Sequence, residues 1–233
     1  MIHHLAKRRT VWVPTLWGWV LLIAVGGASG LLWWFDAESF LSPTRRLPAE
    51  VLVVEGWIGI EAIRGAAAEF EHGGYRFLVT TGGLSSARWS EKQGDYAAMA
   101  EYELIRAGVQ KDRIIAAHAN DTARQRTFEV AAAAWWALTD NNLHPTAVNV
   151  FTVGPHARRS RLVFAKVFGS ATEIGVISWV PPVNQGKPWW HSSERADDLF
   201  KETIAYVFEL LLNSGRGSNA PISQGIEGVQ SHR

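Results

Sequence analysis

The chain has 233 residues, no cysteine and a formal net charge of +1. This length suffices for one sizeable domain with additional segments. The absence of thiols excludes disulfides, thiolate nucleophiles and cysteine-based metal sites, and the near-neutral charge gives no general electrostatic reason to expect nucleic-acid binding.

Residues 11–35 contain no charged side chain and exceed the roughly 20 apolar residues that cross a bilayer. Tryptophans lie at both ends of the stretch, as in interfacial aromatic belts. Lys7, Arg8 and Arg9 precede it, whereas the charges that follow it cancel. The positive-inside rule therefore predicts a single-pass inner-membrane anchor, with residues 1–10 in the cytoplasm and the rest of the chain extracytoplasmic. A cleaved signal peptide is the alternative, but the apolar run continues beyond the small residues 28–30.

Two less regular segments flank the remaining chain. Residues 36–50 contain two prolines, which indicates a short linker. Residues 214–233 are rich in glycine, serine, asparagine and glutamine, which predicts a disordered tail.

Strand and helix patterns alternate through residues 51–213. β-Branched apolar runs predict strands at 51–54, 75–80, 113–117, 148–153 and 173–179. Helical periodicity predicts helices at 60–71, 90–107, 122–139, 156–168 and 196–212, two of them opened by Ser90 with Gln93 and by Thr122 with Gln125. This alternation predicts a single Rossmann-like α/β domain of three layers, with a mostly parallel sheet of about five strands.

Ligands of such sheets bind at the carboxyl ends of the strands. Glu55 and Gly56 follow the first predicted strand, and Thr81, Gly82 and Gly83 follow the second. The glycines can bring backbone N–H groups close to a ligand because they lack a Cβ. We therefore expect Gly56 and the Thr81–Gly83 loop to contribute to a binding site.

The helix after the fourth strand begins with His156, Arg158 and Arg159. Cations at the positive end of a helix are unfavourable unless an anion or a carboxylate lies among them. These side chains are either solvated or an anion site, and their place at the ligand edge favours the anion site. Arg158 and Arg159 would then hold a phosphate, and His156 would serve as general acid or base.

Two carboxylates are further candidates. Glu91 lies in the first turn of a predicted helix, where it either complements the helix dipole or takes part in acid–base chemistry. Glu55 ends a buried strand and needs a partner, which the arginines could provide. Either carboxylate could orient His156 or activate water. Metal-ligand spacings, the P-loop and the dinucleotide fingerprint are all missing, so no metal ligand is assigned and the cofactor is unknown. A divalent ion held between Glu55, Glu91 and a ligand phosphate stays open.

The segments VLVVEGW, LVTTGG, RTFEVA and FTVGPHARRSRLVFAKVFG, in this order, resemble the ElyC/SanA/YdcF family of bacterial envelope proteins. The resemblance covers about residues 50–212. It matches a His-x-x-Arg motif to His156 and Arg159, the Thr-Gly-Gly loop to residues 81–83, and Thr127 to the first residue of a Thr-x-x-Asn motif. Val130 stands where that family has asparagine, and residues 55–57 replace a Leu-Gly-Gly-like loop.

The resemblance implies a role in peptidoglycan or lipid-carrier metabolism. We therefore expect a membrane-anchored envelope protein that binds, and as an enzyme would hydrolyse, a phosphate-bearing small molecule or lipid-linked sugar. A non-catalytic assembly or regulatory factor is one alternative. A domain that binds a nucleotide or S-adenosylmethionine is another, which the resemblance alone suggests.

Overall fold

The computed structural model describes residues 12–84, 95–120 and 125–211. The chain forms two compact units, residues 1–37 and 38–233. The expected cytoplasmic segment 1–10 and the expected tail 214–233 lie outside the described residues.

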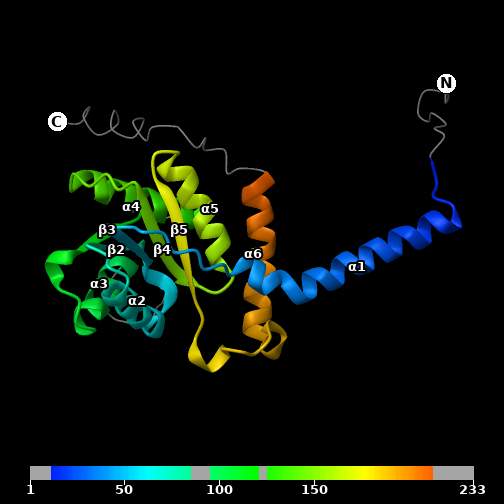
Figure 1. Cartoon of the computed structure of the whole chain (residues 1–233), viewed down its shortest axis with the longest axis horizontal. Helices are drawn as coiled ribbons and strands as arrows, with labels where there is room; N and C mark the ends of the chain where they lie inside the picture. Colours follow the sequence, from blue (N-terminus) through cyan, green and yellow to red (C-terminus); the bar gives the residue numbers. More distant parts are fainter. Residues whose placement is uncertain (1–11, 85–94, 121–124, 212–233) are drawn as a thin grey trace, which may run out of the picture. The chain divides into compact units, whose positions relative to one another are not determined.

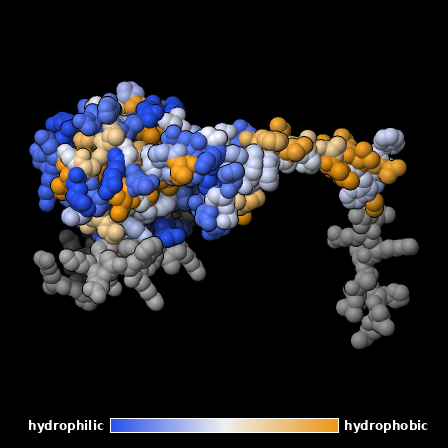
Figure 2. Space-filling model, turned by 90° about the horizontal axis from the view of Figure 1, so that it is seen from below, coloured by the Kyte–Doolittle hydropathy of each residue, from blue (hydrophilic) through white to orange (hydrophobic). Residues whose placement is uncertain are grey.

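Helix α1 (Leu16–Leu41) makes up most of the first unit. It is long and apolar enough to cross a membrane. Its 26 residues extend about 39 Å, which exceeds the roughly 30 Å hydrocarbon core of a bilayer. Large apolar side chains along it are exposed, and Figure 2 shows hydrophobic residues along the helix with paler ones between them. The predicted apolar segment is therefore a helix, although it begins and ends later than residues 11–35.

The second unit is built on a five-stranded sheet in the order β3-β2-β1-β4-β5, with every pair parallel (Figure 1). The prediction of a parallel α/β fold is confirmed. The strands are β1 (Val51–Glu55), β2 (Phe77–Gly82), β3 (Ile114–His118), β4 (Ala147–Val153) and β5 (Glu173–Trp179).

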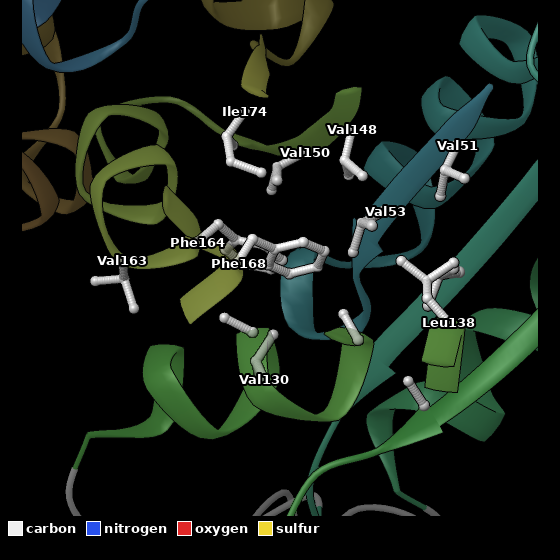
Figure 3. Packing of buried hydrophobic residues seen from close by; sticks show 14 residues of the cluster. Val51, Val53, Val130, Leu138, Val148, Val150, Val163, Phe164, Phe168 and Ile174 are labelled. Carbon is white, nitrogen blue, oxygen red and sulfur yellow. The ribbon is translucent and has the colours of Figure 1, made fainter. Parts of the chain in front are cut away.

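Helices cover both faces of the sheet and give three layers. One buried cluster joins the sheet to α2 (Ile60–His72) and α3 (Tyr96–Arg106). The other joins it to α4 (Arg126–Asp140) and α5 (His156–Phe168), with Phe164 and Phe168 at its centre (Figure 3). Helix α6 (Ser193–Leu211) packs beside α5. Short 3-10 turns are η1 (Gly56–Ile58), η2 (Lys111–Arg113), η3 (Pro182–Asn184) and η4 (Trp189–His191).

Three helix starts differ from the sequence predictions. Helix α3 begins at Tyr96 rather than residue 90, because the carboxylate of Asp95 caps it by accepting from the Ala98 N–H at 2.7 Å. Helix α4 begins at Arg126 after Gln125, which has φ 55° and provides no side-chain cap. Ser90, Gln93 and Thr122 lie outside the described residues. Helix α6 begins at Ser193 rather than 196, where the Ser192 hydroxyl accepts from the first turn at 3.4 Å.

The segment expected to be a linker, residues 36–50, is largely part of the domain. Its first residues continue α1. Arg45 forms an antiparallel bridge with Val176 of β5, with backbone hydrogen bonds of 2.7 and 2.9 Å. The Asn149 amide accepts from the Leu47 N–H at 3.0 Å and donates to its carbonyl at 2.9 Å. Residues 44–47 therefore form an edge segment bonded to the sheet.

Candidate functional site

The chain adds strands to the sheet first on one side of β1 and then on the other, so the strand order reverses between β1 and β4. From β1 it adds β2 and β3 on one side, and it then returns to add β4 and β5 on the other. Ligands of open parallel sheets bind beyond the carboxyl ends of the strands at such a switch point. Glu55 is the last residue of β1, and His156 opens α5 shortly after β4, so both lie at this point.

Glu55 is only 1% exposed. Its carboxylate accepts hydrogen bonds from the hydroxyls of Thr152 at 2.5 Å and Ser160 at 3.0 Å. Burial raises the pKa of Glu55, and these hydrogen bonds together with the charges of His156 and Arg159 oppose the rise. Glu55 is thus held in an environment that favours its protonated form more than water does.

Arg159 makes hydrogen bonds inside the protein. Its guanidinium forms a bidentate pair with Glu202 of α6, with N–O distances of 2.6 and 2.8 Å. A further N–H donates to the Thr127 hydroxyl of α4 at 2.6 Å. The prediction that these helix-terminal arginines need an anion or a carboxylate is met at Arg159 by a protein carboxylate. A phosphate at Arg159 would therefore have to share the guanidinium with Glu202.

His156 is oriented by the same carboxylate. Its Nδ1 lies 2.9 Å from Glu202 Oε1 and 3.3 Å from an Arg159 nitrogen. We assign Nδ1 as a donor to Glu202, because the carboxylate is closer and cannot itself donate. The Trp57 ring packs edge-on against the imidazole, with centroids 4.5 Å apart. Within the described part of the chain Nε2 makes no hydrogen bond, so it is available to a ligand.

Glu202 is held ionised by this arrangement. Burial acts to raise its pKa, but the hydrogen bonds and charges of His156 and Arg159 outweigh that effect and lower the pKa to about 2. The same pairing raises the pKa of Arg159 despite the cost of burial. The Glu202–Arg159 ion pair is therefore fixed over the whole physiological range, whereas burial shifts Glu55 toward its protonated form.

Arg158 does not join this cluster. Its guanidinium donates to the backbone carbonyl of Phe40 and lies over the Phe40 ring, 3.8 Å from the centroid. An arginine at the carboxyl end of α1 complements the helix dipole there. In the structure the Arg158 guanidinium thus contacts Phe40, and its predicted phosphate contact stays a prediction.

The predicted Thr-Gly-Gly loop is mostly strand. Thr81 and Gly82 continue β2 and pair with Ala117 and His118. Thr81 is buried, and its hydroxyl donates to the Val54 carbonyl at 3.2 Å. The structure thus ties Thr81 to the neighbouring strand rather than to an open loop.

The three glycines serve close backbone packing. A Cβ on Gly56 would lie 2.3 Å from the Tyr96 carbonyl oxygen, and one on Gly82 would lie 2.4 Å from the Tyr96 Cβ. A Cβ on Gly83 would lie 3.3 Å from two carbonyl oxygens of the loop after β3. These contacts explain why Gly56, Gly82 and Gly83 lack side chains, and they bring the start of α3 against the ends of β1 and β2.

Glu91 lies outside the described residues, so its predicted role stays a prediction.

Glu202 was missed by the sequence reasoning, although one signal was present. It follows Leu199 by three residues on the buried side of α6, where a glutamate is unexpected without a partner. Thr152 and Ser160 were also missed, since their residue types are ordinary in buried elements, whereas the position of Trp57 just after the first strand had placed it at the ligand edge.

A further charged pair lies at the end of β3, where Asp95 pairs with the exposed His118. Among the described residues, no group of three acidic or histidine side chains could hold a metal ion. A hollow of about 290 Å³, lined mainly by apolar residues with His144 at its rim, lies near the starts of β4 and β5, at the opposite edge of the sheet.

Comparison of the sequence with protein-family models and with curated proteins finds no match.

Proposed function

We propose that this chain is a membrane-anchored bacterial envelope protein whose α/β domain binds a phosphate-bearing ligand at the β1–β4 switch point and hydrolyses it with His156 as the acid–base group. The observation that carries the proposal is the geometry of His156. Glu202 holds its Nδ1, so Nε2 is presented at the edge where ligands of parallel sheets bind.

The start of α5 supplies the attraction for an anion. No side chain caps its first turn, and no acidic residue lies there. The Ala157 N–H donates to the Gly154 carbonyl at 3.2 Å, and the positive end of the helix dipole with the other first-turn N–H groups supports the binding of an anion. Burial favours the protonated form of Glu55. Once Glu55 is protonated, the cluster holds one carboxylate, whose charge Arg159 balances. Repulsion of a phosphate would then be reduced.

The hydrolytic step requires little from the protein besides His156. Nε2 takes a proton from water while the water oxygen forms a bond to phosphorus, and the bond from phosphorus to the leaving oxygen breaks. Glu202 stabilises the resulting imidazolium, because it already accepts from Nδ1. A lipid-linked sugar phosphate suits a domain that follows an N-terminal apolar helix. The positive-inside pattern of the first residues supports an extracytoplasmic location.

The test compares His156→Gln with His144→Gln in the full chain reconstituted in nanodiscs. His144 belongs to the opposite edge of the sheet and is the matched control. With polyprenyl diphosphate as the probe, wild type and His144→Gln should release phosphate, and His156→Gln should lose that release. Equal release by both variants would refute the role of His156.

A non-catalytic assembly or regulatory role is the second candidate. Its support is the internal pairing of Arg159 with Glu202 and Thr127, which is typical of a structural network. This role predicts that wild type binds polyprenyl phosphate in nanodiscs without releasing phosphate from the diphosphate. Binding without turnover would favour it over hydrolysis, and absence of both would contradict both candidates.

A further inference from the structure

Helix α6 carries its polar and apolar sides in an unusual arrangement. On most surface helices the apolar side faces the core and the charged side faces water. The buried side of α6 carries Glu202 beside the apolar Leu199, and the half-buried Tyr206 and Glu209 side chains share that side. Its outer face consists of Ile204, Val207, Phe208 and Leu211, whose exposed fractions are 71%, 45%, 49% and 73%.

The spacing of these residues places them together. They recur at intervals of three and four along the helix, which aligns them on one side over two turns. Phe200 extends the same side toward the start of α6 and contacts the Trp189 ring of η4, with centroids 5.8 Å apart. A continuous exposed apolar stripe of this kind marks an interaction surface.

Contacts within the second unit bring α6 close to the expected membrane surface. Phe40 packs edge-on against Tyr206 of α6, with ring centroids 5.7 Å apart. Glu38 forms an ion pair with Arg195, at the start of α6. Phe40 is only five residues beyond Phe35, the last residue of the apolar stretch. Five residues of chain reach at most about 18 Å, so α6 must lie near the bilayer if α1 spans it.

We propose that the outer face of α6 lies in the interface of the lipid bilayer. This inference rests on the membrane-anchoring part of the proposed function. A helix with an apolar side and a polar side binds a membrane surface by burying the apolar side at the boundary between headgroups and acyl chains. The exposed Trp190 beside Trp189 is the residue type enriched at that depth.

The docked helix would place the candidate site next to the lipid. Glu202 holds His156 and Arg159 from one side of α6, and Ile204 belongs to the outer face only two residues further on. A helix with its side chains is about 10–12 Å across. The site therefore lies about one helix diameter from the bilayer surface, within reach of a phosphate carried by a lipid.

The absence of cysteine from the chain allows a direct test. Single-cysteine variants of the full chain at Ile204, Leu211, Tyr102 and Leu22 are labelled with a bimane fluorophore. They are reconstituted in phosphatidylcholine–phosphatidylglycerol vesicles with and without brominated phosphatidylcholine. Tyr102 is the matched control, because it is 61% exposed on α3, a helix that covers the other face of the sheet. Leu22 reports on the anchor.

Labels at Ile204 and Leu211 should lose fluorescence to brominated lipid, and the label at Tyr102 should keep it. Unquenched labels at Ile204 and Leu211 with a quenched label at Leu22 would overturn the docking of α6 and leave the anchor intact. Quenching at Ile204 without quenching at Leu22 would support docking and overturn the anchor. An unquenched label at Ile204, together with disulfide cross-linking between unlabelled Ile204→Cys copies, would assign the outer face to a second copy of the chain and also overturn the proposal.

Discussion

The domain contains two buried polar networks that differ in charge. The first surrounds Asn149 near the start of β4, where the amide bonds the edge segment and also donates to the Tyr75 hydroxyl at 3.0 Å. The second is the cluster of Glu55, His156, Arg159 and Glu202 at the opposite edge. The Asn149 network joins a neutral amide to fixed backbone groups. The second network instead contains four ionisable side chains, which core packing does not require.

This difference separates a structural role from a functional one. A buried neutral amide with satisfied donors and acceptors fixes the position of a segment at little electrostatic cost. Buried charges are costly even when they are paired, and a well-packed apolar group could replace them without loss of stability. Perturbed ionisable groups also concentrate at functional sites. The comparison therefore favours the β1–β4 edge as the site of chemistry. It assigns the Asn149 network the structural role of holding the edge segment on the sheet.

The largest expected effect is from Glu202→Ala, which would leave the buried Arg159 guanidinium without its carboxylate. Loss of one partner of a buried ion pair costs about 3–5 kcal/mol. Denaturant unfolding of the full chain in detergent, followed by tryptophan fluorescence, should show this decrease. Asp197→Ala, which removes an exposed pair with Lys201 on the same helix, is the control and should change nothing measurable. Equal stability of Glu202→Ala and wild type would mean that the cluster is not a coupled unit.

A smaller effect is expected from Asn149→Ala. The substitution leaves the Leu47 backbone groups without their partner, at a cost of about 2 kcal/mol. It should also release the edge segment, so that trypsin cleaves after Arg45 or Arg46 faster than in wild type. Asn141→Ala, at the exposed end of α4, is the control. Phosphate release should fall only in proportion to the loss of folded protein. A loss of turnover in protein that remains folded would contradict a purely structural role for the Asn149 network.

The smallest effect has the opposite sign. Burial raises the folded-state pKa of Glu55 above its ordinary value of 4.5, so ionisation of Glu55 above pH 4.5 lowers stability. Glu55→Gln should therefore stabilise the protein at pH 7, because the amide carries no charge for burial to penalise.

The pH dependence of that gain is the measurement that checks it. Below pH 4.5 the carboxyl is protonated in both states, so the difference between Glu55→Gln and wild type should vanish there. Glu202 behaves in the reverse way, because its lowered pKa gives stability above pH 4.5 that is lost as the pH falls toward 2. Glu55→Gln should keep phosphate release as it gains stability, because the neutral amide reproduces the protonated carboxyl that reduces repulsion of a phosphate. A destabilised variant would show that Glu55 is structural.

Much of the fold follows from local pattern. The β-branched runs of β1 and β4 and the periodicity of α5 predict these elements within one residue, because they depend on side chains close in sequence. The start of α3 could not be placed in the same way. Both Ser90 and Asp95 are suitable caps, and the close packing of Tyr96 on Gly56 and Gly82 selects the later start.

The candidate site, like the fold, could be predicted from the sequence only in part. The sequence alone brought Glu55 and His156 to the carboxyl edge, because strand order and chain direction place the ends of parallel strands together. It also indicated that arginines at a helix start need a negative partner. Only the tertiary structure decided that the partner of Arg159 is Glu202, since residues 43 positions apart meet through the packing of α6 on α5. The same packing turns the apolar side of α6 outward, which no local pattern in that helix could decide.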